Sequence, residues 1–247
     1  MKIFREIFGR IWAVWAVLIF VSTMILFLFP FLLFSYFKRE PIKTYRFISL
    51  SRIWMDVFLT IAGFPLRVTG REYFAPGENY IVLCNHNSFM DVPVSSPAIP
   101  GGNKTIAKIE MAKTPIFGLM YRTGSILVDR KSDSSRKDSF NKMKQVLAMG
   151  LHMCIYPEGT RNKSQEPLKP FHNGAFKLAV DTRKSIVPAL IFNTRKALPA
   201  DKFFYSMPTR LYMDFLPPVH VLPNDTADSL RERVHEIMKA YYLQHSK

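Results

Sequence analysis

The sequence predicts an α/β fold: a mostly parallel central sheet flanked by helices, with an N-terminal hydrophobic helical membrane anchor. Short apolar runs alternate with stretches that read as helix and loop, a pattern typical of buried parallel strands and their connections. The runs are Tyr80–Cys84, Ser125–Val128, Met153–Tyr156 and Ile186–Phe192. A long uncharged run near the N-terminus predicts the anchor, and polar clusters directly after the strands predict where a site would lie.

Length and composition agree with one folded domain and a short appendage. Of the 247 residues, 48% are hydrophobic and 14% aromatic, which excludes an intrinsically disordered chain. The two cysteines, Cys84 and Cys154, are too few for a disulfide-stapled secreted protein, so we expect a reducing compartment. With 34 Lys and Arg against 19 Asp and Glu, the net charge of +15 suits nucleic acid, an anionic membrane or acidic small molecules.

The N-terminal run Ile11–Phe37 favours the membrane among these partners, because it is uncharged and almost entirely apolar. About 20 such residues span a bilayer core as a helix, and the run lacks the cleavage site of a signal peptide. Basic residues flank it on both sides, so a spanning helix and a monotopic anchor that bends back at Pro30 both remain open. We expect the following domain to face the cytoplasm, at the inner or cytoplasmic membrane.

Three helices are expected after the anchor. Phe47–Gly63 has an apolar and a polar face, which leaves two placements open: an interfacial amphipathic helix, or a helix docked on the domain core. A second helix is expected to begin at a cap on Ser134 or Ser135 and to continue to about Met149. The last helix is expected over Ala227–Tyr242.

The pair His86 and Asp91 follows the first predicted strand and has the chemistry of a general base. Imidazole takes a proton near neutral pH, and a carboxylate on its second ring nitrogen would fix the tautomer and stabilise the imidazolium. Five residues of ideal helix rotate by about 140°, so the pair meets only if His86 lies in the turn before a helix. Asn87 or Ser88 as the helix cap would allow that arrangement.

Competing motifs fail on inspection. Gly101–Thr105 lacks the glycine directly before lysine that a phosphate-binding loop requires, and the chain has no G-x-S-x-G nucleophile motif. His86 and Asp91 have no third zinc ligand nearby, so no metal site is expected. Cys84 precedes the histidine block, where a buried strand cysteine is the ordinary interpretation and a thiol acyl-enzyme the alternative.

Four blocks resemble one known family. His86 and Asp91 match the H-x-x-x-x-D signature of the glycerolipid acyltransferases, the family of 1-acyl-glycerol-3-phosphate (lysophosphatidate) acyltransferases. The other blocks follow in the family's order: Gly124–Arg130 resembles G-x-x-F-x-x-R with Leu127 at the aromatic position, Tyr156–Arg161 resembles F-P-E-G-T-R with Tyr for Phe, and Val187–Leu190 resembles a short apolar block with proline. The resemblance covers Tyr80 to Phe192, and the P-E-G-T-R run in register with H-x-x-x-x-D is its most specific part.

The resemblance implies the roles of individual residues. His86 and Asp91 would be catalytic, and the second and third blocks would hold a phosphate-bearing acceptor. The substrate-binding candidates are Gly124, Arg130, Glu158, Gly159, Thr160 and Arg161, with Lys108 as a further positive contact. Either arginine can present a planar fork to phosphate, Gly159 allows close backbone approach, and Glu158 is expected to bind an acceptor hydroxyl or orient an arginine.

The resemblance also implies a reaction and its partners. Acyl would pass from an acyl thioester, acyl-CoA or acyl carrier protein, to the free hydroxyl of lysophosphatidic acid, giving phosphatidic acid. No cofactor, metal or covalent enzyme intermediate would be needed, and membrane lipids rather than nucleic acid would be the surroundings. Residues 1–64 would form the membrane anchor and interfacial helix, and residues 65–247 the acyltransferase catalytic domain.

Two alternatives stay open at this point. Within the same class, the acceptor would be another lysolipid or an aminolipid. From a different class, the chain would be a non-catalytic basic protein bound to a membrane or to nucleic acid. That second alternative explains the charge and the apolar run, but it does not explain four blocks in order.

Overall fold

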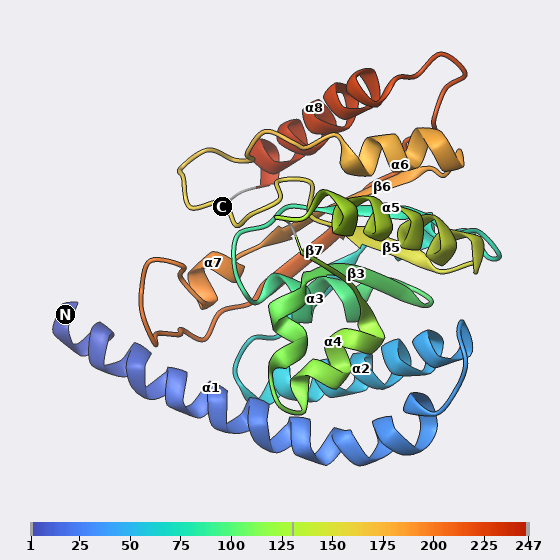
Figure 1. The fold of residues 1–247 in the computed structure, drawn as a ribbon. Coiled ribbons are helices and arrows are strands. Elements are labelled where there is room, and N and C mark those ends of the chain that lie inside the picture. Colours follow the sequence, from blue (N-terminus) through green and yellow to red (C-terminus); the bar gives the residue numbers. More distant parts are fainter. Residues whose placement is uncertain (1, 130, 246–247) are drawn as a thin grey trace.

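A computed structural model describes residues 2–129 and 131–245, which form a seven-stranded sheet between two layers of helices (Figure 1). The strands are β1 (Leu66–Thr69), β2 (Ile81–Cys84), β3 (Asn103–Lys108), β4 (Ser125–Val128), β5 (His152–Ile155), β6 (Ile186–Phe192) and β7 (Leu211–Phe215). Their order is β1-β7-β6-β2-β5-β3-β4, and of the neighbouring pairs only β6 and β7 are antiparallel. The predicted mostly parallel α/β fold is confirmed.

Helices cover both faces of this sheet. The α-helices are α1 (Lys2–Phe31), α2 (Ile42–Ile61), α3 (Asp91–Ala98), α4 (Phe117–Gly124), α5 (Asp133–Ala148), α6 (Gly174–Thr182), α7 (Thr194–Ala197) and α8 (Ala227–His245). Three short helices of other types are η1 (Leu32–Tyr36, a π-helix), η2 (Arg71–Tyr73) and η3 (Ile109–Lys113). Helices α1 to α4 lie on one side of the sheet, and α5, α6 and α8 lie on the other (Figure 1).

Two hydrophobic clusters, one on each face, hold the layers together. Successive side chains of a strand point to opposite faces. Accordingly, Val82 and Cys84 of β2 join the cluster under α1 to α4, whereas Ile81 and Leu83 join the cluster under α5, α6 and α8. Both faces of β2 are therefore buried, which is why its sequence is a continuous apolar run.

The predicted elements correspond closely to observed ones. Strands β4 and β6 have the predicted bounds, β2 begins one residue later than predicted, and β5 begins and ends one residue earlier. Helix α8 begins at Ala227 as expected and continues to His245. Helix α5 is capped by Ser132 rather than Ser134 or Ser135, because the Ser132 side chain accepts a hydrogen bond from the Ser135 N–H.

The apolar N-terminal segment forms α1 and then η1, and the chain turns back into α2. Pro30, the expected point of reversal, lies inside α1, and the reversal falls at residues 37–41, after the π-helical turn of η1. The two helices run antiparallel and in contact: Trp12 Nε1 donates to the Ala62 carbonyl and Trp54 Nε1 donates to Thr23 Oγ1, both at 3.0 Å. Helix α1 therefore lies along the domain instead of leaving it.

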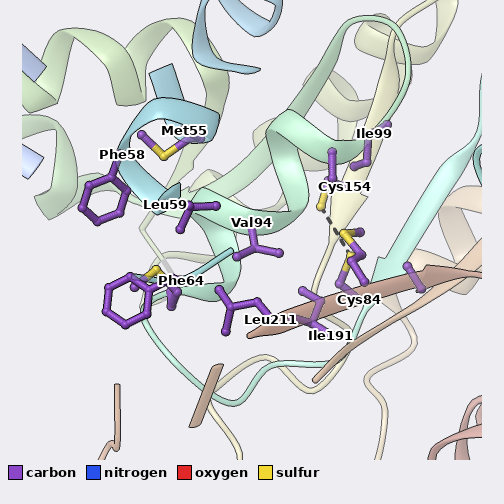
Figure 2. Packing of buried hydrophobic residues seen from close by; sticks show 14 of the residues in the cluster. Met55, Phe58, Leu59, Phe64, Cys84, Val94, Ile99, Cys154, Ile191 and Leu211 are labelled. Carbon is purple, nitrogen blue, oxygen red and sulfur yellow. Dashed lines mark hydrogen bonds between the residues drawn. The ribbon is translucent and has the colours of Figure 1, made fainter. Parts of the chain in front are cut away.

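Of the two placements left open for the Phe47–Gly63 helix, the structure adopts the docked one. The side of α2 that carries Met55, Phe58 and Leu59 is buried against α3 and the sheet (Figure 2). Ala16 and Met24 of α1 belong to the same cluster as these residues. Residues 1–64 thus share a core with the rest of the chain, and their separation as a membrane-binding unit remains a prediction about function.

Candidate active site

The turn between β2 and α3 brings His86 and Asp91 together. Asp91 is the first residue of α3, and its buried carboxylate reaches back into the turn, where Oδ2 lies 2.8 Å from His86 Nδ1. The same Oδ2 accepts the backbone N–H groups of Asn87 and Ser88 at 2.6 and 2.7 Å. His86 therefore lies in the turn, as the geometry required, but neither Asn87 nor Ser88 is the N-cap, which is Met90.

This contact decides which nitrogen of His86 carries the proton. An ionised carboxylate only accepts hydrogen bonds, so Nδ1–H donates to Asp91 and Nε2 keeps its lone pair. The His86 side chain is 19% exposed, and no described residue makes a hydrogen bond to Nε2. The arrangement is that of a general base: one nitrogen is held by a buried carboxylate and the other is open to a substrate.

Glu158 holds the backbone of His86 from below. Its Oε1 accepts the His86 N–H at 2.7 Å and its Oε2 accepts the Lys169 N–H at 3.0 Å, while the Asn162 N–H donates to the His86 carbonyl at 2.6 Å. Burial raises the pKa of Glu158, whose residue is only 1% exposed. Glu158 was expected to bind an acceptor hydroxyl or to orient an arginine. In the structure both of its carboxylate oxygens instead bind backbone N–H groups of the protein.

Tyr156 supports the imidazole ring. Its ring centroid lies 4.4 Å from that of His86, and its hydroxyl lies 2.7 Å from Oγ of the buried Ser95. Beneath it, Cys84 and Cys154 are free and fully buried, with Sγ atoms 3.9 Å apart (Figure 2). The contact with Cys154, together with burial, raises the pKa of the Cys84 thiol. The full burial of this side chain corresponds to the ordinary structural interpretation of a strand cysteine.

Arg161 places a positive charge at the rim of the site. Its guanidinium carbon lies 3.6 Å from the ring centroid of Phe89, which belongs to the His86 turn and is 65% exposed. Stacking on an aromatic ring holds the planar fork in place without using its N–H donors. Those donors stay available to a phosphate or carboxylate beside the histidine.

A cavity of about 760 Å³ extends from this rim into the helical layer that contains α1, α2 and α4. Phe89, Met90 and Arg161 line it at the site, and side chains of α1, α2 and α4 line the remainder. They are mostly apolar and include Ala13, Phe20, Trp54, Phe58 and Met120. A largely apolar pocket with few polar groups at one end suits a ligand with a long hydrocarbon part.

The remaining predicted residues occupy different positions. Gly159 has a left-handed φ of 70°, and a Cβ there would lie 2.8 Å from the His172 ring, while Thr160 Oγ1 accepts from Lys169 Nζ at 2.6 Å. Gly124 lines the cavity at a point where a side chain would overlap the Phe47 ring, and Lys108 is exposed at the end of β3. Arg130 lies outside the described residues.

Several contributors were not found from sequence. Asn162 directly follows the third block, and Ser95 and Phe89 lie in and before α3, but their roles depend on contacts between distant segments. Of these residues, only Phe89 could have been singled out from sequence, because it is an aromatic residue inside the H-x-x-x-x-D block. Within residues 2–129 and 131–245, no group of three His, Cys, Asp or Glu side chains is placed to hold a metal ion.

Comparison with known proteins defines the class of this chain. A sequence model of the Acyltransferase family matches residues 65–192, more than half of the chain, so the chain belongs to the Acyltransferase family. The motif blocks predicted this family, and that prediction is confirmed.

The relatives include several proteins of one activity. A 1-acyl-sn-glycerol-3-phosphate acyltransferase of Cocos nucifera is 29% identical over 76% of this chain and 60% of its own length. The alpha form of that enzyme in Mus musculus is 30% identical over 72% of this chain and 65% of its own length, and a Helicobacter pylori protein of the same name is 29% identical over 87% and 86%. The chain spans less than two thirds of the coconut and mouse proteins.

A solved structure shares the fold. The crystal structure of the 1-acyl-sn-glycerophosphate (LPA) acyltransferase of Thermotoga maritima superposes with a TM-score of 0.79 at 20% identity. The likeness covers 99% of this chain and 97% of that one, so it includes both N-terminal helices.

Proposed function

We propose that this chain transfers an acyl group from an acyl thioester to the free hydroxyl of 1-acyl-glycerol-3-phosphate and so forms phosphatidic acid. The observation that carries the proposal is the juxtaposition of an oriented base, His86 with Asp91, and a cationic group, Arg161 on Phe89, at one end of an apolar cavity. The names of the relatives support the same acceptor.

The proposed reaction is a direct transfer. His86 Nε2 takes the proton of the acceptor hydroxyl as its oxygen attacks the thioester carbonyl carbon. The tetrahedral intermediate collapses and the C–S bond breaks. The departing sulfur takes the proton from Nε2 and leaves as a thiol, which returns His86 to its neutral form. Asp91 stabilises the imidazolium between these steps, Arg161 holds the acceptor phosphate, and the cavity accepts hydrocarbon. The step needs no cofactor, and the donor is acyl-CoA or an acylated carrier protein.

We also propose that the protein is a monotopic membrane protein. Helix α1 is long and apolar enough to cross a membrane, yet it lies along α2, and its outer side exposes apolar residues. A helix with one apolar side free suits insertion into one leaflet, with basic residues at both ends near anionic headgroups. This placement leaves the site on one side of the membrane, and we place it on the cytoplasmic side.

The acceptor assignment is tested with purified protein, a panel of lysolipids and both donors, with products identified by mass spectrometry. Arg161→Ala should lower kcat/KM for lysophosphatidic acid about ten- to a hundredfold, the effect of losing one charge-assisted contact, and Arg161→Lys should recover part of it. The KM for the donor should change little. Arg67→Ala, which removes an exposed arginine from the far edge of the sheet, is the matched control.

The outcome that contradicts the assignment is a wild-type preference for a neutral acceptor without a phosphate monoester, or an equal loss of donor and acceptor use in Arg161→Ala. For the membrane, the pair Leu18→Gln and Ile25→Gln on α1 should lower vesicle partitioning at least about tenfold. Both side chains are more than half exposed, as is Leu243 on α8, so Leu243→Gln is the control that should leave partitioning unchanged.

A further inference from the structure

The segment from Leu198 to Ser206, here called the aromatic loop, follows α7 and joins two functional parts of the molecule. At one end, Ser88 Oγ of the His86 turn donates to the Leu198 carbonyl at 2.9 Å. At the other end, the Ser206 N–H donates to the Gly9 carbonyl of α1 at 3.0 Å. In Figure 1 this part of the chain, in orange, descends from α7 beside the blue N-terminal turns of α1.

Side chains fix the aromatic loop on α1. Lys202 forms an ion pair with Glu6, and the Tyr205 ring packs so closely on Gly9 that a side chain at position 9 would overlap it. Glycine is therefore needed within an otherwise bulky helix at this one place. The first three turns of α1 and the aromatic loop form one joined surface.

The tip of the loop exposes two large aromatic side chains. Phe203 is 89% exposed and Phe204 is 45% exposed. Phe204 also has a left-handed φ of 48°, a conformation that residues with a side chain rarely adopt. Next to them on α1, within one turn of the Glu6 contact, Ile3, Phe4 and Ile7 are also more than half exposed. The loop and the start of α1, joined by the Lys202–Glu6 ion pair and the Tyr205–Gly9 packing, thus both expose large apolar side chains. Exposed apolar side chains gathered in this way mark a contact site with a partner or a membrane.

This surface borders the cavity. The aromatic loop lines one wall, Ala13 and Val17 of α1 line another, and Arg161 lies at the catalytic end. Because Phe203 both lines the cavity and is the most exposed of these residues, it stands at the mouth. The cavity thus opens outward between α1 and the tip of the loop.

We propose that Phe203 and Phe204 insert into the interfacial region of a lipid bilayer and hold the cavity mouth against the membrane. The occupant is a bilayer for three reasons. The aromatic surface continues the exposed side of α1, aromatic side chains favour the membrane interface, and exposed Lys2 and Arg5 beside it suit anionic headgroups. A lysolipid then enters from the leaflet through this mouth with its headgroup toward Arg161, and its hydrocarbon chain does not cross water. The inference rests on the membrane-associated acyl transfer proposed above.

Insertion is measured with a fluorescent label. The native cysteines are fully buried, so Phe203→Cys offers one accessible thiol for a nitrobenzoxadiazole dye. On vesicles of phosphatidylcholine and phosphatidylglycerol, the emission should shift to the blue, rise severalfold, and be quenched by nitroxide-labelled phospholipid. The matched control is Leu222→Cys, an exposed position before α8 on the opposite face of the sheet, whose label should not change.

The outcomes separate this inference from the function on which it rests. A label at position 203 that stays in water while the protein sediments with vesicles overturns the inference alone. A protein that stays in solution overturns the membrane association, and this inference with it. Neither readout depends on turnover.

A second measurement tests the role of the mouth. The double change Phe203→Ser and Phe204→Ser should lower the rate on long-chain lysophosphatidic acid in vesicles about tenfold, the effect of losing roughly 1.4 kcal/mol. The rate on a short-chain, monomeric lysophosphatidic acid should fall clearly less, because this acceptor reaches the cavity from water and not from the membrane. Equal losses on both acceptors would mean damage to the site itself and would overturn the proposal.

Discussion

His86 and His152 lie at opposite ends of two neighbouring strands, and only one of them is equipped as a base. His86 follows the carboxyl end of β2, and its ring meets a carboxylate on one nitrogen and solvent on the other. His152 begins β5, and its ring lies against Phe74 and Tyr80, with Nδ1 accepting the Tyr80 N–H at 3.0 Å. Burial lowers the pKa of His152 to about 4, so it is a neutral structural residue.

The difference teaches that a histidine becomes a base through its partners and not through its place beside a strand. Both residues occur next to apolar runs in the sequence. A carboxylate partner orients His86, whereas burial among rings favours the neutral form of His152. The changes below test this comparison, from the largest expected effect to the smallest.

The largest effect is expected for His86→Ala, which removes the base while leaving its partners in place. Turnover should fall about 10²- to 10⁴-fold, the usual contribution of general base catalysis. Phosphatidic acid formation measures it, and circular dichroism checks the fold. A folded His86→Ala protein with wild-type turnover would refute the mechanism.

Asp91→Asn should be next, because it removes the charge that orients His86 and stabilises its protonated form. We expect kcat to fall at least about 100-fold with little change in the donor KM. Asp56→Asn, at an exposed position on α2, is the control and should be silent. If kcat survives in Asp91→Asn, the carboxylate only shapes the turn.

Glu158→Gln tests whether the backbone of the His86 turn must be held. An amide has one acceptor oxygen, so one of the two backbone N–H groups loses its partner, and the misplacement of His86 should cost about ten- to a hundredfold in kcat. The same change should cost little in a protein that already carries His86→Ala, because the two residues act as a unit. Glu166, an exposed residue in the same loop, gives the control Glu166→Gln. If the losses from Glu158→Gln and His86→Ala add in the double variant, Glu158 does not act by positioning His86.

His152→Asn should leave turnover near wild type and alter only the pH dependence of stability. The folded pKa of about 4 lies below the ordinary value of 6.5 for histidine, so the unfolded chain binds more protons between these values. His152 thus lowers stability as the pH falls through this window, by about 3 kcal/mol in total. Asn keeps an acceptor for the Tyr80 N–H. Urea unfolding of the variant at several pH values should therefore show a smaller dependence of the free energy of unfolding on pH between about 4 and 6.5. An unchanged slope would contradict the assignment.

The apolar strands could be predicted from sequence because nearly all of their residues are apolar by themselves, whatever their partners are. Ser125–Val128 and Ile186–Phe192 match β4 and β6, since strands with both faces covered are apolar throughout. Strand β3 escaped prediction because it buries polar side chains whose partners come from elsewhere. Thr105 pairs with Ser125, and Lys104 is 8% exposed yet reaches Glu40 at 2.8 Å.

The site could be predicted in its residues more than in its contacts. The H-x-x-x-x-D spacing brings His86 and Asp91 together through one local turn, so sequence alone was sufficient. Glu158 was expected on the substrate side, because nothing in its block indicates that its two oxygens meet backbone N–H groups of residues 86 and 169. Pro30 likewise was expected to end a helix that in fact continues beyond it.

The hydrophobic cluster that α1 and α2 share with the sheet has a consequence for protein production. Trimming residues 1–64 to obtain a soluble enzyme would remove two of the four helices on one face of the sheet and open the cluster to which the fully buried Met213 and Ile191 belong. Such a fragment should aggregate in the expression host. A soluble variant is better made by replacing exposed apolar residues of α1 with polar ones. The buried side of α1 then still covers the hydrophobic cluster.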